Sequence, residues 1–174
     1  MYITCLDVEG VLVPEIWVAF AEESGIPELK RTTRDEPDYN KLMRWRLGFL
    51  DELRSFSQVI LISDTFTEFA QPLMEKLGRP TLFCNSLEIA DNGEITDFKM
   101  RVENSKLSTV KALQSIGFDT IASGDSYNDL GMIQAGKAGF LFRTTEKIKE
   151  DYPEIPAYET YEELLGAIKS VISI

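Results

Sequence analysis

The fold is decided by the stretch Tyr2-Ile3-Thr4-Cys5-Leu6-Asp7-Val8-Glu9-Gly10-Val11-Leu12, in which an apolar run ends in two carboxylates and a glycine. Such a run, bounded by a turn signal, is typical of a buried central strand in a parallel sheet. Open α/β sheets place their ligand sites just beyond the carboxyl ends of the strands, so we expect Asp7 to lie in a ligand-binding crevice. An isolated Asp-x-Glu is equally typical of a solvated loop, so further signals are needed.

Three later stretches supply those signals, and each is predicted to reach the same edge of the sheet. Ser63-Asp64-Thr65 follows the apolar run 59–62, and Gly124-Asp125-Ser126-Tyr127-Asn128-Asp129 follows the run 120–123. Lys106 falls in the first turn of a helical pattern, where a cation opposes the helix dipole at a cost of up to about 1 kcal/mol. An anion held nearby reverses the sign of that effect.

The rest of the chain alternates strands with helices, which predicts a doubly wound α/β fold with a parallel sheet. Asp91-Asn92-Gly93 predicts a hairpin that stands off the sheet as a flap. Pro72 predicts a kink or an early break in its helix, and Thr160 with Glu163 predicts a capping box. Beyond the opening run, strands are predicted at 58–62, 81–84, 118–123 and 138–142, the hairpin at 87–98, and helices at 14–25, 38–53, between 65 and 78, at 104–116, at 128–135 and from 160 onward.

The four stretches, in this order, resemble the four motifs of the haloacid dehalogenase-like phosphotransferases. The resemblance spans nearly the whole chain. The opening stretch and the Gly-Asp-Ser-Tyr-Asn-Asp run are most similar to the bifunctional phosphoserine phosphatase/homoserine phosphotransferase group. The resemblance implies a Rossmann-like core domain formed by residues 1–13 and 49–174, with residues 14–48 inserted as a helical cap. Members of this family normally carry a larger cap, so a stretch of cap is expected to be missing.

The resemblance implies that Asp7 is a nucleophile that forms an aspartyl-phosphate, which splits one transfer into two steps. Glu9 is expected to protonate the leaving alkoxide and then to activate the acceptor, although a surface carboxylate is the simpler reading of this residue. The implied cofactor is Mg²⁺, which prefers oxygen ligands, held by Asp7, the backbone carbonyl of Glu9 and Asp125. Asn128 and Asp129 are expected behind these ligands, with Asp129 orienting Lys106; helix capping is an equally good reading of both.

Phosphate binding is expected from Ser63, Asp64, Lys106 and Gly10. The Ser63 hydroxyl and a neighbouring backbone N–H would donate to the phosphoryl group, and Lys106 would bring a compact positive charge to it. Gly10 permits close approach of the backbone. Thr65 is as well suited to capping the next helix as to touching a ligand.

Substrate selection is expected in the cap. By resemblance, Glu15 would hold a substrate ammonium group and Arg46 a carboxylate, with Tyr39 and Met43 lining the pocket. An exposed helix charge is the alternative for Arg46.

With the resemblance, these residues predict a Mg²⁺-dependent phosphatase or phosphotransferase that acts on a small phosphorylated amino acid; the resemblance implies phosphoserine as the expected substrate and homoserine as a possible acceptor. Three alternatives stay open: a phosphatase for another small phosphometabolite, a receiver-like signalling module, and a catalytically weakened phosphate-binding protein. A receiver places its acceptor Asp on a middle strand of the sequence, whereas Asp7 ends the first strand.

Composition limits the partners. The 174 residues carry a net charge of −11 and 44% hydrophobic residues, which predicts one packed domain that does not bind nucleic acid or anionic membranes. The chain contains no histidine, which excludes histidine-based triads and histidine zinc sites. Cys5 and Cys84 fall in predicted strands and are expected to be reduced core thiols. We therefore expect a cytoplasmic enzyme, monomeric or homodimeric, without a targeting or membrane segment.

Overall fold

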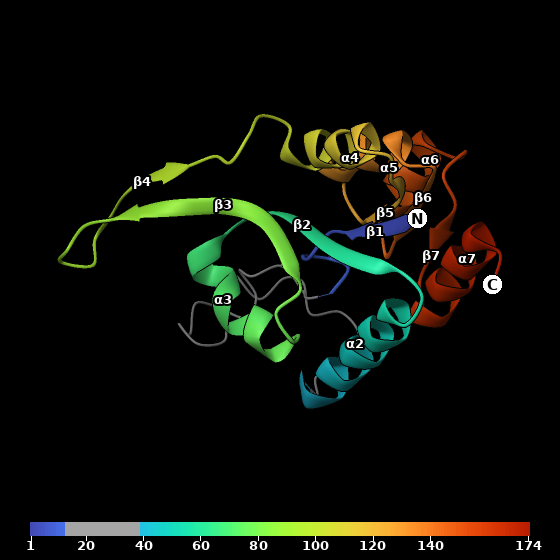
Figure 1. Cartoon of the computed structure of the whole chain (residues 1–174), viewed down its shortest axis with the longest axis horizontal. Coiled ribbons are helices and arrows are strands. Elements are labelled where there is room, and N and C mark those ends of the chain that lie inside the picture. The colour runs from blue at the N-terminus through green and yellow to red at the C-terminus, as the bar shows by residue number, and fades with distance from the viewer. Residues whose placement is uncertain (13–38) are drawn as a thin grey trace.

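The computed structural model describes residues 1–12 and 39–174, and its centre is a seven-stranded sheet (Figure 1). The strand order is β4-β3-β2-β1-β5-β6-β7, and every neighbouring pair is parallel except β3 with β4. The strands are β1 (Tyr2–Leu6), β2 (Gln58–Phe66), β3 (Thr81–Ile89), β4 (Ile95–Lys99), β5 (Asp119–Gly124), β6 (Ala138–Phe142) and β7 (Ala157–Tyr158).

Helices cover both faces of this sheet, so the predicted doubly wound fold is confirmed (Figure 1). On one face, apolar side chains of α2, α3 and α7 pack against the sheet; on the other face, those of α4, α5 and α6 do so. The described helices are α2 (Tyr39–Arg54), α3 (Thr67–Lys76), α4 (Ser105–Ser115), the 3₁₀ turn η2 (Tyr127–Asp129), α5 (Leu130–Ala135), α6 (Glu146–Asp151) and α7 (Tyr161–Ile172).

The central strand β1 pairs with β2 on one side and with β5 on the other. The chain thus winds outward from β1 in both directions, and the loops after β1, β2 and β5 diverge at one edge. This is the place at which open α/β sheets bind ligands. Asp7 follows the last residue of β1 at that edge.

Two strands are longer than predicted. β2 continues to Phe66, so Ser63, Asp64 and Thr65 lie within the strand and not after it, and the pairing with β3 shifts register between Ile62 and Phe66. β3 continues from the sheet into the predicted hairpin, where Leu87 lies opposite Phe98. The hairpin is confirmed and stands off the body of the protein as predicted (Figure 1), and its first strand is the continuation of a sheet strand.

Several local predictions can be compared with the helices. The capping box of Thr160 and Glu163 is present at the start of α7. The early break at Pro72 is wrong, because α3 continues past it to Lys76, and α3 begins after Phe66 without a side-chain cap from Thr65. The elements α6 and β7 were not predicted; they have six and two residues, too few to show a period.

The predicted boundary between cap and core falls inside one long helix. α2 passes without interruption through the predicted boundary between residues 48 and 49, and its last turns bury Phe49, Leu50 and Leu53 in the core. The helix predicted at 14–25 lies outside the described residues. In the part of the chain that is described, no helix is long and apolar enough to cross a membrane.

Candidate active site

The carboxyl edge of the sheet gathers the acidic residues that the sequence singled out. Asp7 leaves β1 with its backbone N–H donated to the carbonyl of Ser123, the last but one residue of β5, at 2.9 Å. Its own Oδ1 accepts from the backbone N–H of Val8 at 2.8 Å. These two bonds fix the direction in which the Asp7 carboxylate leaves the strand.

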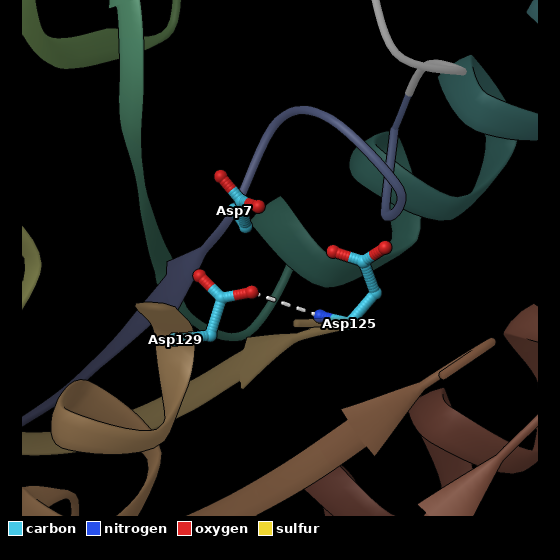
Figure 2. Close-up of side chains that lie close together, drawn as sticks. All are labelled: Asp7, Asp125 and Asp129. Carbon is cyan, nitrogen blue, oxygen red and sulfur yellow. Dashed lines mark hydrogen bonds between the residues drawn. The ribbon is translucent and has the colours of Figure 1, made fainter. Parts of the chain in front are cut away.

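Asp7, Asp125 and Asp129 form an acidic cluster; they lie directly after β1, directly after β5 and in η2 (Figure 2). Each of the three offers a carboxylate oxygen, and these oxygens all lie within 4.8 Å of one another. Asp7 is 4% exposed and Asp129 is fully buried. Three carboxylates in this space repel one another, so the cluster needs a positive charge.

Lys106 supplies one positive charge. Its Nζ lies 2.5 Å from Asp129 Oδ1, 3.0 Å from Asp7 Oδ1 and 3.8 Å from Asp64 Oδ2, and the side chain is 5% exposed. Burial lowers the pKa of Lys106, but the charges of Asp7 and Asp129 outweigh it and raise the pKa above its usual range. Lys106 therefore stays protonated.

The pKa of Asp7 is raised from 3.8 to about 8, first by burial and then by the charge of Asp129, while Lys106 acts in the opposite direction. One ammonium group thus does not balance the acidic cluster. An oxygen-rich cluster with excess negative charge fits a hard divalent cation such as Mg²⁺, which would hold Asp7 ionised.

Asp129 combines both of the roles that the sequence left open. One oxygen binds Lys106, and the other accepts from the backbone N–H groups of Asp125 and Ser126, each at 3.0 Å, within a capping box at the start of η2. The amide of Asn128 donates to Asp64 Oδ2 at 2.7 Å. Both residues therefore brace charged groups of the edge.

Three comparisons bear on this constellation. The model of the haloacid dehalogenase-like hydrolase family matches residues 15–134, which is more than half of the chain. A protein named phosphoserine phosphatase ThrH, from Pseudomonas aeruginosa, is 45% identical over 94% of this chain and 93% of its own length. The chain belongs to the haloacid dehalogenase-like hydrolase family. A phosphoserine phosphatase from Pseudomonas syringae pv. tomato is 42% identical over 93% of this chain and 80% of its own length.

Solved structures agree with the family fold. A phosphoserine phosphatase captured as a phospho-aspartyl intermediate analogue has a TM-score of 0.68 at 22% identity, over 95% of this chain and 97% of that one. A phosphoserine phosphatase from T. onnurineus has a TM-score of 0.66 at 21% identity, over 97% of this chain and 94% of that one. At these identities the likeness shows the shared fold of the haloacid dehalogenase-like hydrolases.

Two glycines let the backbone of this haloacid dehalogenase-like hydrolase approach the acids closely. Gly10 has φ +76°, and a Cβ there would lie 2.1 Å from Cγ of Asp125. A Cβ on Gly124 would lie 2.3 Å from Cγ of Asp129. Any larger residue at either position would displace a carboxylate of the cluster.

Ser63 lies at the same edge, is 2% exposed, and accepts through Oγ from the backbone N–H of Thr65 at 3.1 Å. Its hydroxyl hydrogen is left to donate elsewhere. Glu9 is half-buried, two residues beyond Asp7. These positions are compatible with the roles expected of both residues.

Of the four cap residues predicted to bind the substrate, only Arg46 has a described side chain. It is 4% exposed, so the alternative of an exposed helix charge is wrong. Arg46 lies close to Tyr161. Burial raises the pKa of Tyr161 above its usual value, and the positive charges of Arg143 and Arg46 oppose this shift without cancelling it. Tyr39 and Met43 lie on α2, but the structure does not describe their side chains. Glu15 lies outside the described residues.

The sequence missed two residues that hold the loops of the site. Thr144 Oγ1 donates to the carbonyl of Asp125 at 2.5 Å. Asn85 donates to the carbonyl of Asp64 at 2.9 Å and accepts from the backbone N–H of Arg101 at 3.0 Å. Each bonds to backbone groups across the fold, so no local motif marks it.

Proposed function

We propose that this chain is a Mg²⁺-dependent phosphatase that hydrolyses phosphoserine through an aspartyl-phosphate on Asp7. The observation that carries the proposal is the buried contact of Lys106 with Asp7 inside the acidic cluster, at the end of the central strand. Two relatives more than 40% identical over nearly the whole chain bear the name phosphoserine phosphatase, which supports this substrate.

In the first step, an oxygen of Asp7 attacks phosphorus and the bond from phosphorus to the serine oxygen breaks. Glu9 gives its proton to the leaving alkoxide, so that serine departs neutral. In the second step, Glu9 takes a proton from water as the water attacks the phosphorus of the aspartyl-phosphate, and Asp7 and inorganic phosphate are released. Asp7 returns to its starting state.

Binding of the phosphoryl group is assigned to residues around Asp7. Ser63 donates its hydroxyl, Asp64 its backbone N–H, and Lys106 its charge, while Gly10 lets the backbone approach. Asp7, the carbonyl of Glu9 and Asp125 would hold Mg²⁺, which when bound neutralises charge on the phosphoryl oxygens. Asn128 and Asp129 keep Asp64 and Lys106 in place.

Recognition of the amino-acid end is assigned to a cap at residues 14–48. Glu15 would pair with the ammonium and Arg46 with the carboxylate, beside Tyr39 and Met43. The alignment with the P. aeruginosa relative spans 191 positions but covers 94% of the 174 residues of this chain, so that relative has internal residues that this chain lacks. Their absence is compatible with a shortened cap. Because a smaller lid excludes water less well, hydrolysis should dominate over transfer to homoserine.

We further place the enzyme in the cytoplasm, acting on a small molecule without nucleic-acid or membrane partners. Cys5 and Cys84 are free, and burial raises the pKa of the Cys5 thiol to about 12, which suits a reducing compartment. A phosphatase for another small phosphometabolite is the main alternative. The family match argues against a receiver-like module.

A phosphate-release screen over phosphorylated metabolites tests the proposal. Phosphoserine with Mg²⁺ should give the highest kcat/KM, EDTA should abolish release, and added homoserine should divert only a minor part of the phosphate. Preference for a sugar phosphate would favour the alternative. Mg²⁺ binding is measured separately as a rise in melting temperature, which Asp125→Asn should reduce.

The assignment of Arg46 has its own control. Arg46→Ala should raise KM for phosphoserine and hardly change the cleavage of p-nitrophenyl phosphate, which has no carboxylate. The exposed Arg44 on the same helix is the matched control. Arg44→Ala should change neither KM for phosphoserine nor the cleavage of p-nitrophenyl phosphate. Equal losses on both substrates would remove Arg46 from substrate binding.

A further inference from the structure

The hairpin formed by residues 86–99, here called the arm, projects from the body of the protein (Figure 1). Its second strand, β4, is the outermost strand on one side of the sheet, and all five of its residues are exposed. Within residues 1–12 and 39–174, no strand pairs with its outer edge. An open strand edge is a template for pairing with another chain.

The arm has one apolar face. Leu87 lies opposite Phe98, and Ile89 lies opposite Ile95, so these side chains share a face, with Met100 next in the alternation. Each of the last four is exposed, by 49% for Ile89, 55% for Ile95, 57% for Phe98 and 51% for Met100. A contiguous exposed apolar surface of this kind marks an interaction site.

The hydrogen bonds of the arm show which backbone groups face outward. Leu87 donates its backbone N–H to Glu68 of α3, away from β4. The Leu87–Phe98 pair is therefore not a hydrogen-bonded pair of the hairpin, and the N–H and C=O of Phe98 point to the open edge. Within the described residues, the Phe98 N–H donates to the side chain of the preceding residue, Asp97 Oδ1, at 2.8 Å.

We propose that β4 pairs with β4 of a second copy of this chain, antiparallel, about a two-fold axis at Phe98. In this register, Phe98 lies opposite its own copy, and Asp97 of each chain lies opposite Lys99 of the other. The two Phe98 residues exchange N–H and C=O bonds, and Asp97 turns from its neighbour's N–H to the facing ammonium group. The two sheets become one.

Charge selects this register. A two-fold axis at Asp97 would set that carboxylate opposite its own copy, and an axis at Lys99 would do the same with two ammonium groups. Like charges directly opposite each other destabilise a strand pair, whereas opposite charges stabilise it. Among Asp97, Phe98 and Lys99, the axis at Phe98 is the one that gives two opposite-charge pairs and no like pair. A self-complementary strand is what an isologous dimer requires.

Sedimentation velocity over a range of concentrations tests the pairing with the full chain. The unmodified protein should show a concentration-dependent equilibrium between monomer and dimer. Asp97→Lys and Lys99→Asp each set like charges opposite each other, and each should weaken association at least tenfold. The double variant restores opposite charges and should return the dissociation constant to within threefold of the original.

Controls separate this pairing from general charge effects. Asp91→Lys at the tip of the arm and Lys111→Asp on α4 change the net charge by the same amounts, and neither should alter association. Phe98→Pro removes the outward N–H without removing a bond of the hairpin, so it should give a folded monomer. A monomer at all concentrations, a dimer that withstands either single reversal, or a double reversal without rescue would each overturn the proposal.

Discussion

The carboxyl edge of the sheet and the arm both depart from the usual rule that charged side chains are exposed and apolar side chains are buried. They depart from it in different ways. At the edge, charged groups are buried: Asp7, Lys106 and Asp129 are 4%, 5% and 0% exposed. On the arm, large apolar groups are exposed, with Phe98 and Ile95 more than half accessible. Buried charge and exposed apolar surface are both unfavourable in isolation, so each implies something that compensates for it. We propose that this compensation comes from an ion and a phosphoryl group at the edge, and from a second chain at the arm.

The largest effect is expected at the edge. Asp7→Asn removes the proposed nucleophile and should lower kcat for phosphoserine on the order of 10³-fold or more. Asp119→Asn is the matched control, because Asp119 begins β5, at the end of the strand away from the site, and is half exposed. Steady-state kinetics with circular dichroism separates lost chemistry from lost folding. Substantial turnover by Asp7→Asn would break the link between buried charge and catalysis.

The next effect concerns the stability of the edge. Lys106→Met leaves Asp7 and Asp129 facing each other without their shared cation, which should lower the free energy of unfolding by about 3–5 kcal/mol. Lys137 forms an exposed ion pair with Asp119 at 2.9 Å, and Lys137→Met should leave the urea midpoint nearly unchanged. Similar midpoints for the two variants would mean that burial does not decide the strength of these contacts.

A smaller effect depends on pH. Because the pKa of Asp7 is raised from 3.8 to about 8, metal-free protein takes up a proton there on folding, and the resulting stability is lost as pH rises from about 4 through about 8. Asp7→Asn has no such loss. In EDTA, the melting temperature of this variant relative to wild type should therefore increase from pH 5 to pH 8.5. A constant difference would show that Asp7 stays ionised throughout.

The smallest effect is expected on the arm. Ile95→Ala should change the free energy of unfolding by no more than about 0.5 kcal/mol, because the side chain is exposed. Ile62→Ala, in the core of β2, should cost about 2–5 kcal/mol. Chemical unfolding at a concentration where the protein is monomeric makes the comparison. A large cost at Ile95 would indicate that the apolar face is already covered within one chain.

The sequence predicted the residues of the carboxyl edge more completely than the structure of the arm. Asp7, Ser63 and Asp125 could be placed together because a parallel sheet brings the ends of its strands to one edge whatever the loops do. The continuity of β3 could not be predicted, since Asn85 and Ser86 extend the strand by pairing with Phe66 of β2 and Lys99 of β4. A short polar stretch carries no signal for such distant partners.

The roles of single residues were harder to separate. Capping and the orienting of Lys106 were alternative readings of Asp129, and the structure shows that its two oxygens perform both. Thr144 and Asn85 escaped notice because their partners are backbone carbonyls far along the chain. For Arg46, the helical pattern gave no indication of burial, which depends on the packing of α2 against α7.

The two glycines at the edge also limit how this sequence can evolve. Every residue that a single nucleotide change can substitute for glycine carries a Cβ, and at Gly10 or Gly124 that atom would meet a carboxylate at 2.1 or 2.3 Å. At Gly48 and Gly166 nothing lies within 4 Å, so a methyl group is accommodated there at no steric cost. Substitutions of glycine are thus sterically tolerated at Gly48 and Gly166 on the helices but not at Gly10 and Gly124 beside the acids. There a side chain would push the carboxylates of the cluster apart.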